Sequence, residues 1–271
     1  MVDREQFDEW RRERAASAGA VRRNGTFDRL ERDAEGISVV HYRLAGDRHQ
    51  AGEADAPAQW ASVRARSIIG ADGARSGVAR QAVPGAANVD CVFAYHEIVR
   101  APAHKPAGYD GSRCDVYYQG HLSPDFYGWV FPHGDTLSIG TGSADKGFSL
   151  RSAVGTLRQA SGLQDAATLR REGAPIPMKP LPRWDDGHDV VLAGDAAGVV
   201  APASGEGIYY AMLGGRLAAE AAEPFLRTGD ARALTQARRR YMKLHGRDFL
   251  NQRINQGVWY RNDALRERFV S

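Results

Sequence analysis

The pattern of hydrophobic positions is clearest between residues 189 and 225. Val190 to Ala193 form a short apolar run that ends at Gly194-Asp195, which predicts a buried strand of a parallel sheet. A loop of small residues, 196–204, follows, and Gly205-Glu206-Gly207 then opens a helix. The predicted buried face of that helix contains Ile208, Ala211, Met212, Gly215 and Ala219. A strand, a tight turn and a helix rich in small residues together place a helix N-terminus against an anionic group.

The first seventy residues predict one helix followed by several strands. Phe7, Trp10, Ala15 and Ala18 give an amphipathic helix with Asp3 as its N-cap and Gly19 at its end. The stretch 21–44 predicts strands broken at Asn24-Gly25 and at 33–36, and 45–57 predicts a loop. Residues 60–69 alternate again and predict a strand that leads into Gly70-Ala71-Asp72-Gly73.

The middle and the end of the chain differ in their residue patterns and in the secondary structure that these predict. Residues 80–188 carry prolines, aromatics and alternating stretches, which favour an antiparallel sheet with one buried face. Tyr127, Trp129 and Phe131 are spaced by two, so they share one face of a strand, and spacing alone favours ordinary core packing. Residues 227–271 are helical and basic, which predicts a solvated helix face, with contact to a membrane surface as the alternative.

Composition narrows the class of protein without identifying it. The 271 residues are 43% hydrophobic and 25% charged, as in an ordinary soluble globular protein, and the net charge of +3 does not favour nucleic acid as a partner. Cys91 and Cys114 lie far apart, which predicts reduced thiols, and the histidines form no pattern typical of a metal site. We expect no signal peptide and no membrane span.

The glycine-rich stretch carries the clearest candidate chemistry. Gly194, Gly205 and Gly207 remove side chains that would keep a ligand away from the backbone. Asp195 follows the strand at its carboxyl end, where open α/β sheets bind their ligands. Turns and close packing would also explain the glycines, but the whole run favours a cofactor site. Asp72-Gly73 alone would predict only a turn, and it gains weight because it ends a second such strand.

These motifs resemble those of a known family. GDAAG with the following P.SGEG resembles the second flavin fingerprint of FAD-dependent oxidoreductases of the glutathione-reductase-like superfamily, and GADG resembles another of its motifs. KPLPRWDDG and IYYAM on either side, MVDREQFDEW at the start, and Y.W.FP with G.G inside PDFYGWVFPHGDTLSIGTG resemble the geranylgeranyl reductases of the bacteriochlorophyll and chlorophyll pathway. The resemblance covers essentially the whole chain.

The resemblance implies a fold and a division of the chain. We expect an α/β (α+β) protein, with an incomplete FAD-binding Rossmann domain of the glutathione-reductase-like type, an antiparallel-sheet substrate domain and a C-terminal helical segment. The FAD-binding part would comprise residues 1–80 and 189–226, the substrate domain 81–188, and the helical segment 227–271.

The resemblance also implies roles for individual residues. Asp195 would bond the ribityl and phosphate region of the flavin, and the helix beginning near Gly205 would face the pyrimidine edge of the flavin ring. The cofactor-binding candidates are Arg4, Asp72, Gly73, Gly194, Asp195, Ala196, Pro202, Gly205, Glu206 and Gly207. The candidates for an isoprenoid pocket are Tyr127, Trp129, Phe131, Pro132, Gly140 and Gly142, with the two glycines letting the strand pass close to flavin or substrate.

The implied reaction is reduction of C=C bonds in a geranylgeranyl group towards phytyl, on the free diphosphate or on the (bacterio)chlorophyll ester. The implied cofactor is FAD, reduced by NADPH or by a ferredoxin. An alkene has no carbonyl to polarise, so a well-placed acid must supply a proton. Tyr117, Tyr118 and His121 are candidates, and the sequence does not choose between them. The expected location is the cytoplasm, with peripheral attachment to photosynthetic membranes.

One expected motif is missing. No GxGxxG follows an early strand, and no acidic residue is placed to hold an adenosine ribose. Family members carry that unit ahead of the segment matching Met1 to Arg4, so we expect exposed apolar edges and weak FAD binding by this chain alone. The alternatives are a flavin monooxygenase or halogenase on the same scaffold, and an inactive remnant.

Overall fold

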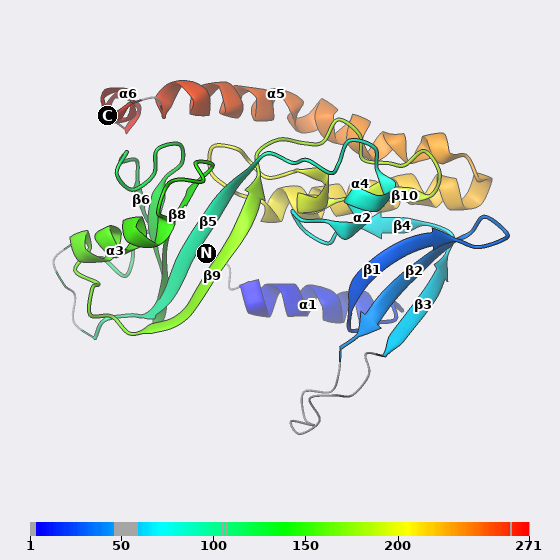
Figure 1. The fold of residues 1–271 in the computed structure, drawn as a ribbon, viewed down its shortest axis with the longest axis horizontal. Helices are drawn as coiled ribbons and strands as arrows, with labels where there is room; N and C mark the ends of the chain where they lie inside the picture. The colour runs from blue at the N-terminus through cyan, green and yellow to red at the C-terminus, as the bar shows by residue number, and fades with distance from the viewer. Residues whose placement is uncertain (1–3, 46–58, 104–105, 107, 261, 271) are drawn as a thin grey trace.

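The computed structural model describes residues 4–45, 59–103, 106, 108–260 and 262–270. Asp3, the predicted N-cap, and nearly all of the predicted loop of 45–57 lie outside these residues. The described chain contains three sheets and several helices (Figure 1). The helices are α1 (Arg4–Ser17), α2 (Gly77–Ala82), α3 (Leu150–Ala160), α4 (Ile208–Thr228), α5 (Thr235–Trp259) and α6 (Asp263–Val270), with short 3-10 turns at Gly194–Ala197 and Ala231–Ala233.

The parallel strand predicted from the glycine-rich stretch is confirmed. The strand β10 (Val190–Leu192) is completely buried and pairs in parallel with β4 (Ile68–Gly70). The single strand predicted over 60–69 is wrong in one respect, because the chain changes sheets within it. The first part, β3 (Trp60–Ala65), completes an antiparallel sheet with β1 (Gly25–Arg32) and β2 (Ser38–Leu44), and β4 then joins β10.

The helix predicted after Gly207 is confirmed as α4, but its buried face is not the predicted one. The side that packs against β10 and α5 consists of Leu213, Gly214, Leu217, Ala218, Ala221 and Ala222. Met212 is 42% exposed, and Ala219 is also exposed. The remaining predicted residues, Ile208, Ala211 and Gly215, line a cavity described below. The helix therefore has two apolar sides, and the stripe that we predicted faces the cavity rather than the core.

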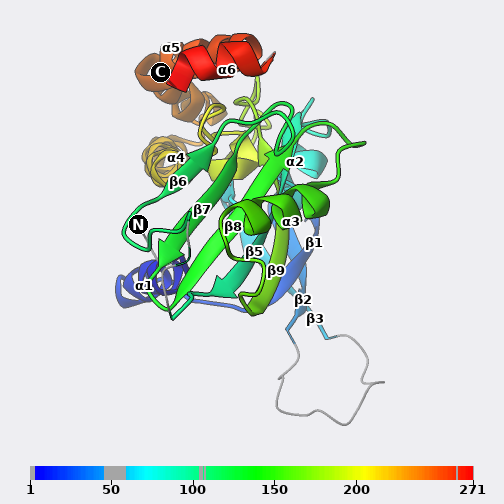
Figure 2. The same ribbon diagram turned by 90° about the vertical axis from the view of Figure 1, so that its left-hand side faces the viewer.

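The predicted antiparallel sheet has five strands in the order β6-β7-β8-β5-β9. Their bounds are β6 (Asp115–Tyr117), β7 (Gly128–His133), β8 (Thr136–Ser143), β5 (Cys91–Arg100) and β9 (Thr168–Pro177). The helix α3, which we did not predict, covers one face of this sheet (Figure 2). Buried Leu157 and the 2.5 Å bond between Arg158 and Glu97 attach α3 there. The opposite face of the five-stranded sheet is not covered by α3, and it carries the aromatic side chains described below.

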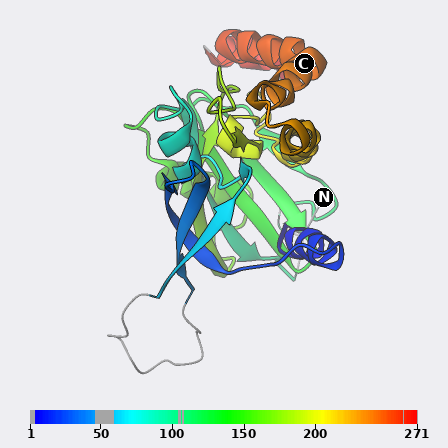
Figure 3. The ribbon, with the colours of Figure 1, turned by 90° about the vertical axis from the view of Figure 1, so that its right-hand side faces the viewer.

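The helices at the two ends of the chain lie on one side of the sheets, with α1 below α4 and α5 above it (Figure 3). The predicted α1 ends near Gly19 as expected, at a φ of 98°. However, α1 contains no buried residue, and Trp10 is 46% exposed, so its amphipathic pattern does not mark a buried face. Most of the described residues after 227 are helical, as predicted, and lie in α5 and α6. Among the described helices none is long and apolar enough to cross a membrane.

Candidate functional site

The glycine-rich turn opens onto a cavity of about 410 Å³ between the start of α4, the strand pair β4–β10 and the start of α1. We call it the glycine pocket. It brings together six of the ten residues predicted to bind a cofactor, although they come from three separate parts of the sequence. These six are Arg4, Gly73, Gly194, Asp195, Gly205 and Gly207. Ile69, Ile176, Ile208, Ala211 and Gly215 add an apolar lining.

The glycines leave space on the pocket side. A Cβ atom built on Gly73 or on Gly215 would meet no atom within 4 Å, so both backbones face open space. Gly73, Gly194 and Gly205 have φ values of 83°, 61° and 68°, which L side chains rarely adopt. The glycines therefore let a ligand approach the backbone closely, and the volume of about 410 Å³ lies within the usual range of ligand pockets.

Two opposite charges face each other in the glycine pocket. Burial raises the pKa of the Asp195 carboxyl, and the positive charge of Arg4 acts in the opposite direction. Arg4 itself is held by Asp8, whose carboxylate accepts bonds of 3.1 and 2.9 Å from its guanidinium. The first turn of α4, whose backbone N–H groups lack partners within the helix, begins here, and a Cβ built on its N-cap Gly207 would lie 3.5 Å from Asp195 Oδ1. The pocket therefore offers both an acceptor for hydroxyl groups and positive ends for anionic oxygens.

Four predicted cofactor residues do not line this pocket. The carboxylate of Asp72 accepts bonds from the Ser76 hydroxyl and from the amides of Gly77 and Val78, at 2.7 and 3.1 Å for the amides. Asp72 therefore stabilises the loop that leads into α2. The other three are Pro202, which is buried, Glu206, which is exposed, and Ala196, which faces a different cavity.

The aromatic residues Tyr127, Trp129 and Phe131 share the face of β7 that points away from α3, as predicted from their spacing. We call them the aromatic wall. Their ring centroids are 5.9 and 6.2 Å apart in succession. The Tyr127 hydroxyl donates a hydrogen bond to the carbonyl of Ser204, so the wall touches the glycine-rich loop directly. Pro132, predicted beside them, is buried on the opposite side of β7 because side chains alternate along a strand.

The structure shows a packing role for Gly140 and Gly142, and their close approach to flavin or substrate stays a prediction. Gly140 lies on β8 directly between Trp129 of β7 and His96 of β5. A Cβ there would lie 2.3 Å from the indole and 2.6 Å from the Cβ of His96. At Gly142 it would lie 2.8 Å from Val92 and 3.0 Å from Phe126. Both glycines thus make room for side chains of the protein itself.

The structure also reveals a polar group that the sequence did not indicate. The Trp129 indole N–H donates to Ser138 Oγ at 3.0 Å, and His96 Nδ1 lies 3.0 Å from the same oxygen. His96 Nε2 lies 3.1 Å from Glu172, which opposes the lowering of the His96 pKa by burial. His96, Ser138 and Glu172 border a cavity of about 690 Å³ that Arg4 also lines. Only the strand register, which the sequence does not give, brings them together.

The proposed proton donors separate in the structure. Tyr118 packs against the aromatic wall, with its ring 6.0 Å from Tyr127. Tyr117 packs on the α3 side of the sheet, and His121 is exposed. Burial raises the pKa of both Tyr118 and Tyr127, so both phenols keep their protons at neutral pH. Tyr118 is therefore the candidate that the geometry favours.

The chain is similar in sequence to known proteins. The whole chain is 55% identical to the geranylgeranyl diphosphate reductase of Rhodobacter capsulatus and 36% identical to the chloroplastic one of Oryza sativa. The chain spans 66% and 58% of these proteins, which is less than two thirds of each. No protein-family model matches it.

Solved structures show the same fold. A geranylgeranyl bacteriochlorophyll reductase-like protein from Thermoplasma acidophilum superposes with a TM-score of 0.78 at 20% identity, over 96% of this chain and 64% of that one. The flavin-dependent halogenase CmlS gives 0.62 at 18% identity, over 89% of this chain and 44% of its own. The chain therefore has the fold of a class whose members differ in activity, since it includes both a reductase-like protein and a halogenase. Within that class, the identities to the reductases place the chain in the geranylgeranyl reductase family.

Proposed function

We propose that this chain acts in an FAD-dependent reductase that saturates C=C bonds of a geranylgeranyl group towards phytyl in (bacterio)chlorophyll biosynthesis. The observation that carries the proposal is the contact between the aromatic wall and the glycine pocket, made by the bond from Tyr127 to Ser204. A wall of aromatic rings suits a branched hydrocarbon because it offers dispersion contacts and few unpaired polar groups. NADPH or a ferredoxin would serve as the electron donor.

The glycine pocket would hold the cofactor, and the aromatic wall would hold the substrate. Asp195 and Arg4 would hold the ribityl and phosphate region of the flavin, while the start of α4 faces its pyrimidine edge. When bound, the flavin supplies the hydride for the alkene. Tyr127, Trp129 and Phe131 orient the hydrocarbon and keep water from it, and the Tyr118 hydroxyl provides a proton beside the wall.

The same residues weigh against a monooxygenase or halogenase. An aromatic substrate with polar groups would need polar partners, whereas the aromatic wall consists of rings in succession, and the polar atoms of Tyr127 and Trp129 are already bonded within the protein. We keep the division proposed from the sequence, with residues 81–188 as the substrate part and 1–80 and 189–226 as the cofactor part. Peripheral attachment to a membrane through the basic helices is part of the proposal and awaits a flotation assay with vesicles.

The experiment compares the 271-residue chain with a longer protein that includes an upstream GxGxxG unit. We expect the longer protein to bind FAD and to convert geranylgeranyl diphosphate, with NADPH or reduced ferredoxin, into products that gain two hydrogens per double bond, as measured by mass spectrometry. We expect the 271 residues alone to bind FAD weakly. A yellow 271-residue protein with stoichiometric flavin would refute the second expectation, and unchanged substrate with fully reduced flavin would refute the first.

A further inference from the structure

A second cavity, of about 720 Å³, lies on the other side of the two loops that form the glycine pocket. Gly73 and Asp195 line the glycine pocket, and their next neighbours in the chain, Ala74 and Ala196, line this one. The two cavities are thus separated by the thickness of a single backbone at both places. A ligand in the second cavity would lie close to whatever the glycine pocket holds.

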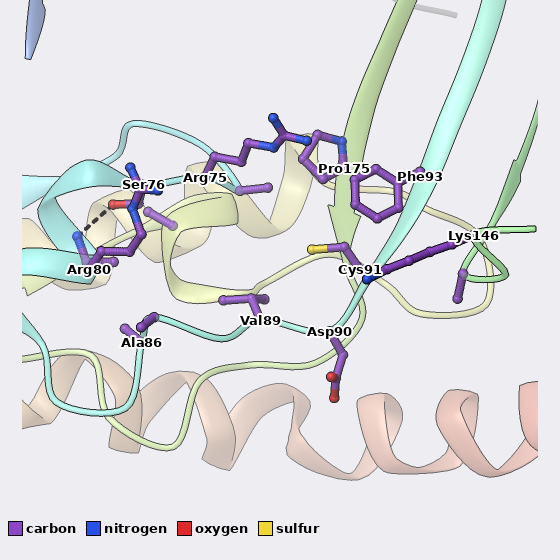
Figure 4. A pocket seen from close by; sticks show the side chains of 15 residues that line it. Arg75, Ser76, Arg80, Ala86, Val89, Asp90, Cys91, Phe93, Lys146 and Pro175 are labelled. Carbon is purple, nitrogen blue, oxygen red and sulfur yellow. Dashed lines mark hydrogen bonds between the residues drawn. The ribbon is translucent and has the colours of Figure 1, made fainter.

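Three basic side chains line the second cavity, which we call the cationic pocket. Arg75 and Arg80 come from the segment around the start of α2, and Lys146 comes from the loop after β8. Figure 4 shows Arg75 and Lys146 reaching towards Cys91 and Phe93 from opposite sides, with Arg80 beside Ser76. Within the part of the chain that the structure describes, we find no carboxylate paired with any of the three.

The acidic side chain that lines the cationic pocket does not neutralise these three cations. Asp90, the one acidic residue among the described lining residues, bonds Lys179 at 2.6 Å and points away from the pocket in Figure 4. Burial raises the pKa of the Cys91 thiol, so the thiol adds no negative charge at neutral pH. Exposed cations on a convex surface are usually just solvated, but here they surround a hollow. The pocket is therefore positively charged and lacks an internal counterion.

An apolar surface formed by Phe93 and Pro175 completes the lining of the cationic pocket. The Phe93 ring and Pro175 lie on neighbouring strands of the five-stranded sheet, opposite one another in register. The Arg75 guanidinium carbon lies 6.0 Å from the centre of the Phe93 ring, within the range of a cation–π contact. A ligand that uses both features must combine an apolar or flat part with a group that carries several negative charges.

We propose that the cationic pocket binds the diphosphate group of a ligand whose remainder rests on Phe93 and Pro175. Arg and Lys together match such a group, because guanidinium binds phosphate oxygens in pairs and ammonium adds a point charge. The inference rests on the proposed function, which supplies three ligands with a diphosphate: FAD itself, the nicotinamide dinucleotide donor and the free isoprenoid diphosphate. A ferredoxin donor and a pigment-esterified substrate would each lack this group in that position.

The test is direct binding to the purified 271-residue chain, which requires neither previously bound FAD nor turnover. FAD, NADPH, geranylgeranyl diphosphate and inorganic diphosphate are titrated separately by calorimetry, against the unaltered chain and against Arg75→Gln, Arg80→Gln and Lys146→Gln. Arg239→Gln, which removes an exposed arginine on α5 far from the pocket, is the matched control. Circular dichroism verifies that each variant remains folded.

We expect inorganic diphosphate to bind and each pocket variant to weaken it about tenfold, as the loss of one charge-assisted contact predicts, with Arg239→Gln unchanged. Binding of FAD, NADPH or geranylgeranyl diphosphate that the three pocket variants weaken to the same extent would identify the ligand as the cofactor, the donor or the substrate, respectively. Binding that is absent, or that all three pocket variants leave unchanged, would overturn the inference. A failure of the proposed function would instead appear as absent turnover with diphosphate binding intact.

Discussion

The glycines of the five-stranded sheet and those of the glycine pocket look alike in the sequence but do opposite things. At Gly140 the missing side chain is replaced by the indole of Trp129, which lies where a Cβ would be. At Gly73 and Gly215 the space stays open. A glycine filled by its own protein contributes to packing, whereas a glycine facing a cavity leaves room for a ligand. The comparison separates the two roles without any ligand in view.

We expect the largest effect from adding a side chain at Gly140, where the Trp129 ring already fills the space. Gly140→Ala places a Cβ 2.3 Å from the Trp129 ring and 2.6 Å from His96, and both neighbours sit on paired strands with little freedom to shift. We expect the free energy of unfolding to fall by about 2–3 kcal/mol, as overpacking of a well-packed region does. Urea denaturation measures it. Unchanged stability would mean that the indole yields easily and that Gly140 is not a packing glycine.

Removing the ring that fills the space tests the other half of the packed case. Trp129→Ala takes away one member of the aromatic wall and its bond to Ser138. We expect the KM for a geranylgeranyl substrate to rise about tenfold in the longer, FAD-loaded protein, with flavin content and flavin spectrum unchanged. Earlier release of partly reduced products is also expected. Lost flavin with an unchanged KM would place Trp129 beside the cofactor instead.

Two helix glycines test whether the open space at a glycine leaves room for a ligand, because one of them lines the glycine pocket and the other does not. Gly215→Ala on α4 and Gly155→Ala on α3 each add a methyl group that meets no atom within 4 Å. Each should stabilise the chain by about 0.5–1 kcal/mol, because alanine favours the helix. Only Gly215 lines the glycine pocket, so only that change should weaken flavin binding, measured by fluorescence titration. Equal flavin affinity in both variants would contradict the pocket assignment.

The smallest expected effect concerns the charge in the glycine pocket. Burial raises the folded-state pKa of Asp195 above its unfolded value, so the stability it contributes is present at low pH and is lost as pH rises through that folded-state pKa. At pH 7, Asp195→Asn should therefore raise the Tm by roughly 2 °C while flavin retention is lost. The stability gain should vanish below about pH 3.9, the usual pKa of an unfolded aspartate. A loss of stability at pH 7 would show that Asp195 is satisfied by the protein itself.

The sequence predicted what is local and missed what depends on register or on partners. The apolar run at Val190 and the glycines after it predicted β10 and the start of α4 because strand and turn preferences act over a few residues. The stripe Ile208, Ala211 and Gly215 was correctly seen as apolar, but no pattern distinguishes a face that packs on protein from one that lines a cavity. His96 and Ser138 meet Trp129 only through strand pairing between distant segments.

Trp129 and Gly140 share one space, and that constrains the order in which the two positions can change during evolution. A larger residue at position 140 is acceptable only after the indole has been replaced by something smaller. The reverse order passes through an overpacked intermediate that selection would remove. Lineages that reshape this wall for another hydrocarbon should therefore show the change at 129 first, and a side chain at 140 should not coexist with tryptophan at 129. The pair behaves as one inherited unit.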